Sequence, residues 1–127
     1  MSSKSAPLIT VVDDEESVGR ALTRLIASAG LSVKAYTGGA EFLASVATRP
    51  PDCVVLDLHM PGMSGFEVQA QLVRLGTQIP VVIITGHDTP DSHQRVMSAG
   101  AVAYLRKPVD GKVLLEAIAT AIARKGP

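Results

Sequence analysis

The 127-residue chain has the usual size of one domain and carries twelve basic (Lys plus Arg) and twelve acidic (Asp plus Glu) side chains. This neutral balance excludes a bulk electrostatic attraction to nucleic acid or to an anionic membrane, so we expect direct contact with neither. The single cysteine can form no disulfide within the chain, and there is no leader-like start and no apolar run near the ~20 residues that span a bilayer. These features predict a cytoplasmic protein.

Five apolar runs, rich in valine and isoleucine, recur along the chain and predict five strands. In chain order they are Leu8–Val12, Leu31–Tyr36, Cys53–Leu56, Ile79–Ile84 and Ala101–Leu105. Cys53 opens the third run, and its thiol is expected to be buried and inert because a free cysteine behaves as a small hydrophobic residue.

Between the strands, apolar residues recur at helical spacing. The first helix is marked by Val18, Leu22, Leu25, Ile26 and Ala29. A shorter second helix is marked by Phe42, Leu43 and Val46, and the stretch Arg49, Pro50, Pro51 stops it. The third and fifth helices are marked by Val68, Leu72 and Leu75 and by Leu114, Ile118, Ala121 and Ile122. Left-handed C-cap residues are expected at Gly30, Gly76 and Gly100.

A fourth helix, Pro90–Ala99, has Val96 and Met97 as its only large apolar residues, so we expect it to be weakly anchored and to move. Strands that are nearly all apolar and alternate with helices must be covered on both faces, which indicates a parallel sheet with right-handed crossovers. The sequence therefore predicts a single α/β domain of doubly wound (βα)₅ architecture, structured over about residues 7–123.

Polar residues follow four of the five predicted strands. Asp13 and Asp14 follow the first, Asp57 the third, Thr85 the fourth, and Lys107 the fifth after one intervening residue. Because the carboxyl ends of parallel strands lie at one edge of the sheet, where ligands bind, we expect these side chains to converge. The second strand ends without a charged residue, as expected of an outer strand.

Three neighbouring carboxylates repel one another unless a cation lies between them, and an all-oxygen ligand set suits Mg²⁺ or Mn²⁺. A metal and a lysine without a glycine-rich phosphate loop favour a small phosphoryl group over a nucleotide. Asp57 is then interpreted as a nucleophile that faces phosphorus. Taken singly, each residue has a plainer explanation, and Asp14 could be only a turn former or a helix N-cap.

Four stretches of the chain resemble the receiver domain of two-component response regulators. They are VVDDEE (11–16), VVLDLHMPGMSG (54–65), IITGH (83–87) and AGAVAYLRKP (99–108). The wording of the second and third stretches is most similar to the FixJ-like subgroup. The resemblance implies a flavodoxin-like sheet of order 2-1-3-4-5.

The resemblance also implies a chemistry. Asp57 would accept a phosphoryl group from the phosphohistidine of a sensor histidine kinase or phosphotransfer protein. Mg²⁺ would bind Asp14 directly, Asp13 mainly through water, Asp57, and the backbone carbonyl of His59. Thr85 would hydrogen-bond a phosphoryl oxygen.

Three further roles are implied near the fifth strand and the mouth of the site. Lys107 would pair with a phosphoryl oxygen, and its bond to Pro108 would be cis. Tyr104 occupies the switch position, which we favour over the alternative of an ordinary partly buried strand residue. His59 and His87 would modulate dephosphorylation and make it sensitive to pH near neutrality, or they are simply solvated loop residues.

Phosphorylation is expected to change the face made by the fourth helix, fifth strand and fifth helix, where a partner or a homodimer would bind. His93 in the fourth helix is interpreted as a surface residue. We expect no output domain in this chain, which is then a stand-alone receiver or the receiver of a longer regulator. Two rival functions remain: a phosphatase, which would usually need a second carboxylate where His59 stands, and a binding-only pseudo-receiver.

Overall fold

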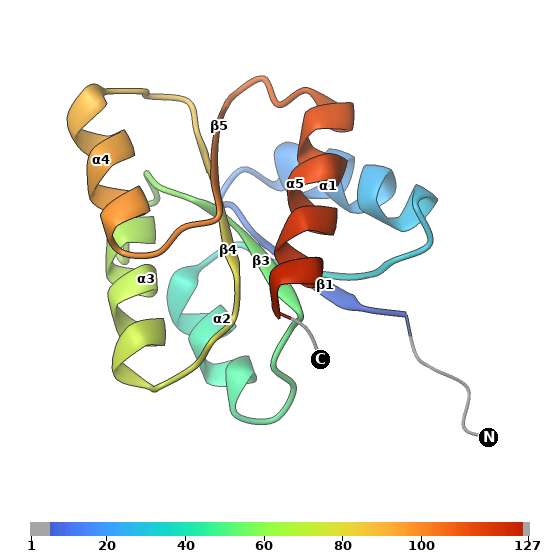
Figure 1. Ribbon diagram of the computed structural model, residues 1–127, viewed down its shortest axis with the longest axis horizontal. Helices are drawn as coiled ribbons and strands as arrows, with labels where there is room; N and C mark the ends of the chain where they lie inside the picture. The colour runs from blue at the N-terminus through green and yellow to red at the C-terminus, as the bar shows by residue number, and fades with distance from the viewer. Residues whose placement is uncertain (1–5, 126–127) are drawn as a thin grey trace.

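The computed structural model describes residues 6–125, in which five strands and five helices alternate along the chain (Figure 1). The strands are β1 (Leu8–Val12), β2 (Ser32–Tyr36), β3 (Cys53–Asp57), β4 (Val81–Thr85) and β5 (Ala103–Arg106). The helices are α1 (Glu16–Ser28), α2 (Gly39–Val46), α3 (Gly65–Arg74), α4 (Pro90–Ser98) and α5 (Gly111–Lys125). Residues 1–5, 126 and 127 lie outside this description, and α5 continues past the predicted limit at residue 123.

The five strands form one parallel sheet in the order β2-β1-β3-β4-β5. The register places Asp57 opposite Ile84 and Thr85 opposite Arg106. The carboxyl ends of β1, β3, β4 and β5 therefore meet at one edge, while β2 lies outermost. The predicted doubly wound fold and its strand order are confirmed.

Helices cover both faces of the sheet, with α1 and α5 on one side and α2, α3 and α4 on the other (Figure 1). Side chains of β3 alternate between two cores: Cys53 and Val55 pack on the α1 and α5 side, whereas Val54 and Leu56 pack on the side of α2, α3 and α4. All of β3 is buried, including the Cys53 thiol, as predicted. Within residues 6–125, none of the helices has both the length and the apolarity that crossing a membrane requires.

Three strands begin later than the sequence predicted: β2 by one residue, at Ser32 rather than Leu31, and β4 and β5 by two residues each. β4 starts at Val81 rather than Ile79, because Pro80 has no N–H to donate to a strand ladder. β5 starts at Ala103 rather than Ala101, because the Ala101 N–H donates to the Val96 carbonyl (3.0 Å) and closes the end of α4. The hydrophobic pattern could not predict these later starts, because Pro80 and Ala101 are themselves apolar.

Two apolar residues assigned to helix faces lie beyond the ends of their helices, whereas three predicted C-cap glycines are confirmed. Ala29 is the exposed C-cap residue of α1. Leu75, assigned to the apolar face of the third helix, is 59% exposed, because α3 has already ended and Leu75 is its C-cap residue. The predicted C-cap glycines all have positive φ: Gly30 at 86°, Gly76 at 74° and Gly100 at 101°. These glycines let the chain reverse directly into the following strand or loop.

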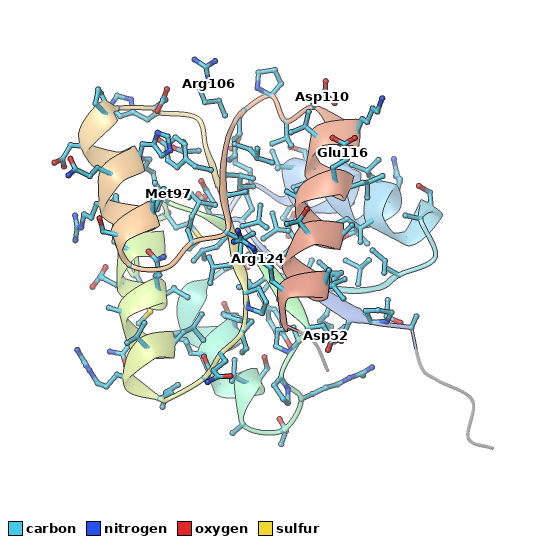
Figure 2. The ribbon with its side chains drawn as sticks, in the orientation of Figure 1. Asp52, Met97, Arg106, Asp110, Glu116 and Arg124 are labelled. Atoms are coloured by element: carbon cyan, nitrogen blue, oxygen red, sulfur yellow. The ribbon has the colours of Figure 1, made fainter. Side chains whose placement is uncertain are left out.

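Helix α4 buries two of its residues, Ser92 and Val96. Val96 is fully buried, whereas Met97, labelled in Figure 2, is 39% exposed. The Gln69 side chain of α3 is also buried, and its Nε2 donates to the Val96 carbonyl at 3.0 Å. Thr89 caps the other end by accepting from the Ser92 N–H at 3.0 Å. The motion predicted for this helix stays a prediction.

Candidate functional site

Five polar side chains gather at the carboxyl edge of the sheet. Asp13 directly follows β1, Asp57 ends β3, Thr85 ends β4 and Lys107 directly follows β5. One carboxylate oxygen from each of Asp13, Asp14 and Asp57 lies within 4.8 Å of the others. Asp13, Asp57 and Thr85 are buried, and Asp14 is half-buried. The fold therefore brings together all the residues that the strand ends had singled out.

Lys107 holds the acidic cluster together electrostatically. Its Nζ lies 2.9 Å from Asp13 Oδ2, 3.1 Å from Glu15 Oε1 and 3.6 Å from Asp57 Oδ2. Burial lowers the pKa of the Lys107 ammonium, but the contacts with these carboxylates outweigh it and raise that pKa above its usual value. Lys107 is therefore charged at any physiological pH. Its bond to Pro108 is cis, as expected.

Asp57 is the carboxylate whose ionisation is most strongly opposed. Burial, followed by the negative charge of Asp13, raises its pKa to about 7. The Lys107 ammonium and the His59 backbone N–H act in the opposite direction but do not compensate fully. Asp57 thus sits in an environment that favours an added positive charge.

The donor set fits a hard divalent cation. Asp13 Oδ2 is buried and makes no hydrogen bond of good geometry within residues 6–125, although Lys107 Nζ forms an ion pair with it at 2.9 Å. A lone pair is therefore left for a metal, and the ligands are carboxylate oxygens, which Mg²⁺ and Mn²⁺ prefer. Asp13, Asp14 and Asp57 would hold such an ion.

The loop after Asp57 is fixed by backbone contacts. The Leu58 N–H donates to the Ile84 carbonyl (3.2 Å), and the Leu58 carbonyl accepts from the Gly65 N–H (2.8 Å). Ser64 starts α3 with a capping box: its Oγ accepts from the Glu67 N–H, and its N–H donates to Glu67 Oε1. The first turn of α3 is therefore locked against the strand tip that carries the nucleophile candidate.

Thr85 and two histidines lie at or just beyond the carboxyl ends of β3 and β4. Thr85 Oγ1 accepts a hydrogen bond from the His87 N–H at 3.0 Å. The exposed rings of His59 and His87 meet edge to face, with centroids 5.6 Å apart. The two loop histidines, two residues beyond Asp57 and Thr85, are thus neighbours in space.

Comparison with known proteins decides the family. The family model of the response regulator receiver domain matches residues 9–119. The chain belongs to this family. Receivers are signalling switches rather than enzymes in the ordinary sense, and they work with sensor kinases in two-component systems.

Individual receivers and regulators are similar over nearly the whole chain. Nodulation protein W of Bradyrhizobium diazoefficiens is 40% identical over 117 residues, which is 92% of this chain and 52% of that protein. The response regulator protein TodT of Pseudomonas putida is 40% identical over 120 residues, which is 94% of this chain and 53% of that protein. This receiver thus spans about half the length of the curated relatives it matches. The crystal structure of FixJ-N superimposes with a TM-score of 0.86 at 35% identity, covering 97% of this chain and 96% of that one.

Two acidic residues at the site were not singled out by the sequence. Glu15 contacts Lys107 through its side chain, and its backbone N–H donates to Asp13 Oδ1 at 2.9 Å. Asp88 accepts a hydrogen bond from the Tyr104 hydroxyl at 2.8 Å. The sequence offered only a weak indication of either residue: Glu15 lies in the loop after β1, and Asp88 lies in the loop after β4. His93, assigned to the surface, is exposed but stacks on the Tyr104 ring.

Proposed function

We propose that this receiver is a phosphoryl-accepting switch whose acceptor is Asp57. A carboxylate oxygen of Asp57 attacks the phosphorus of a phosphohistidine on a sensor kinase or phosphotransfer protein. The new P–O bond forms as the P–N bond breaks, and the released imidazole nitrogen takes up a proton. The observation that carries this proposal is the position of Asp57: a buried strand tip beside two carboxylates and a lysine ammonium.

The surrounding residues have separate roles in the proposal. Mg²⁺ would be held by Asp14 directly and by Asp13 mainly through water, with Asp57 and the His59 carbonyl as further ligands. The bound ion supplies positive charge that offsets the carboxylates and the incoming phosphoryl oxygens. Lys107 pairs with one phosphoryl oxygen and the Thr85 hydroxyl donates to another. The protein catalyses its own phosphorylation and dephosphorylation and acts on no metabolite.

The output of the switch is a change of surface. Phosphorylation draws Thr85 and the β4-α4 loop towards the new charge, Tyr104 turns inward, and α4 shifts with it. The face made by α4, β5 and α5 then binds a partner or a second copy of the chain. We place the receiver in the FixJ-like subgroup and in the cytoplasm. Because its basic and acidic side chains balance, we propose that this chain makes no direct contact with nucleic acid. A DNA-binding partner protein is compatible with this proposal.

The test is incubation with acetyl phosphate and Mg²⁺, followed by intact mass spectrometry and size-exclusion chromatography. We expect one added phosphoryl group that requires Mg²⁺, persists in an Asp91→Asn control and is absent from Asp57→Asn. An earlier elution of the adduct would identify dimerisation as the output. Absence of any adduct would favour a binding-only pseudo-receiver, and steady donor turnover without a lasting adduct would favour either fast autodephosphorylation or a phosphatase.

We also propose that His59 and His87 set how readily water reaches the aspartyl phosphate, because their rings adjoin each other and each histidine lies two residues beyond a site residue, Asp57 or Thr85. Replacing both by alanine is expected to change the half-life of the phosphorylated protein about threefold or more, which corresponds to ~0.7 kcal/mol in the barrier. Arg49→Ala serves as the control, since Arg49 is exposed and lies before β3, at the opposite edge of the sheet from the site. An unchanged half-life in the double variant would leave the two histidines as ordinary loop residues.

A further inference from the structure

Tyr104 is held by contacts from two other elements. Its hydroxyl donates to Asp88 Oδ1 at 2.8 Å, and Asp88 lies in the β4-α4 loop. Its ring stacks on the His93 ring of α4, with centroids 4.6 Å apart and planes 10° from parallel. Arg106 extends from the end of β5 (Figure 2), and its guanidinium lies 3.8 Å from Asp88 Oδ2. Hydrogen bond and stacking both fix the ring in its present, half-buried position.

These contacts join β5 to the N-terminal half of α4, in which Ser92 is also buried. The C-terminal half is secured by buried Val96 and by the hydrogen bond from Gln69 to its carbonyl. The N-terminal half carries exposed His93, whose stacking on Tyr104 links it to the sheet. A rotation of Tyr104 therefore removes the stacking contact between this half of α4 and β5.

The same loop also engages the Thr85 hydroxyl. The register places Ile83 opposite Tyr104, so Tyr104 and Thr85 lie on the same face of adjacent strands, one pleat apart. Thr85 Oγ1 accepts from the His87 N–H, one residue before Asp88. If Thr85 turns to a phosphoryl oxygen, that hydrogen bond is lost and the loop with Asp88 is free to move. Movement of the short segment that contains His87 and Asp88 would therefore break both the hydrogen bond to Thr85 and the hydrogen bond from Tyr104.

We infer that Asp88 and His93 are positioning residues that brace Tyr104 outward and so restrain phosphorylation of Asp57. The inference rests on the proposed function, and it adds two residues that act through Tyr104 without touching the phosphoryl group. The hydrogen bond to Asp88 supplies the larger part of the restraint, because it joins two polar atoms only 2.8 Å apart, whereas the stacked His93 ring is exposed. The ion pair with Arg106 adds little, because it is exposed and 3.8 Å long.

The experiment compares Asp88→Ala and His93→Ala with Asp88→Asn, which keeps an acceptor oxygen but loses the charge. The initial rate of phosphorylation by acetyl phosphate is expected to rise about three- to tenfold in Asp88→Ala, the size of one lost hydrogen bond. A smaller rise of about twofold is expected in His93→Ala, and Asp88→Asn should retain a rate close to that of the parent chain.

A second readout needs no phosphorylation. The chain has two tyrosines, so 3-fluorotyrosine labelling gives two ¹⁹F resonances, which the Tyr36→Phe variant assigns. The Tyr104 resonance is expected to shift in Asp88→Ala and to keep its position in Asp88→Asn. The brace is overturned if Asp88→Ala changes neither readout, or if Asp88→Asn raises the rate as much as Asp88→Ala does. A parent chain that takes up no phosphoryl group contradicts the proposed function instead, and the ¹⁹F comparison still decides the brace.

Discussion

Replacement of Gly65 by alanine is expected to lower the free energy of unfolding by about 2–3 kcal/mol, the cost of an overpacked core position. A Cβ at Gly65 would lie 2.8 Å from Leu58 Cα and closer still to the Asp57 carbonyl oxygen. Both are backbone atoms that cannot rotate away, so α3 and the tip of β3 must separate. The hydrogen bond from the Gly65 N–H to the Leu58 carbonyl would be strained by the same displacement.

Gly19 provides the matched control, because it lies within α1 and a Cβ there would meet nothing within 4 Å. Gly19→Ala is expected to stabilise the protein by about 0.5–1 kcal/mol through helix propensity alone. Chemical denaturation of both variants measures the contrast. A Gly65→Ala variant as stable as the parent chain would show that the close approach of α3 to Asp57 is not required.

Asp57→Asn is expected to stabilise the metal-free protein at pH 8 by about 2–4 kcal/mol, since one pKa unit corresponds to about 1.4 kcal/mol. The carboxyl has a pKa of about 7 in the folded state against an ordinary value of 3.8. A raised folded-state pKa means that the protonated form favours folding, and this contribution is complete below pH 4. It declines as the pH rises and is lost above pH 7, where folding must bury a carboxylate.

The difference in stability between Asp57→Asn and the parent chain should therefore be small at pH 4 and largest above pH 7. Urea denaturation in EDTA across this range measures it. Glu116→Gln, which alters an exposed carboxylate on α5 (Figure 2), should show no such trend. Saturating Mg²⁺ should reduce the advantage of Asp57→Asn, because bound metal stabilises the ionised carboxylate. A pH-independent difference would mean that Asp57 is not held at a raised pKa.

The sequence predicted the sheet and the convergence of the acidic residues for a single reason. In a parallel sheet every strand ends at the same edge, so Asp13, Asp57 and Thr85 are neighbours in space although they are far apart in the chain. Burial was equally predictable, because a five-residue apolar strand such as β3 must be covered on both faces. These statements depend on periodicity and order alone.

The sequence pattern could not predict the contacts between loop side chains. The hydrogen bond from Tyr104 to Asp88 and the ion pair of Lys107 with Glu15 join residues on different loops or strands, and no spacing rule links them. The exposed position of Leu75 was missed because helical periodicity does not reveal where a helix ends. The raised pKa of Asp57 follows from burial and the nearby charge of Asp13, both of which require three-dimensional distances.

The most direct test of the proposed function is to identify the residue that carries the phosphoryl group. After transfer from acetyl phosphate in Mg²⁺, borohydride reduction converts an aspartyl phosphate to homoserine, and tandem mass spectrometry locates the converted residue. We predict homoserine at position 57 and at no other acidic position of the chain. Homoserine at Asp13 or Asp14, or a phosphoryl group retained on a histidine, would contradict the assignment of Asp57 as the acceptor.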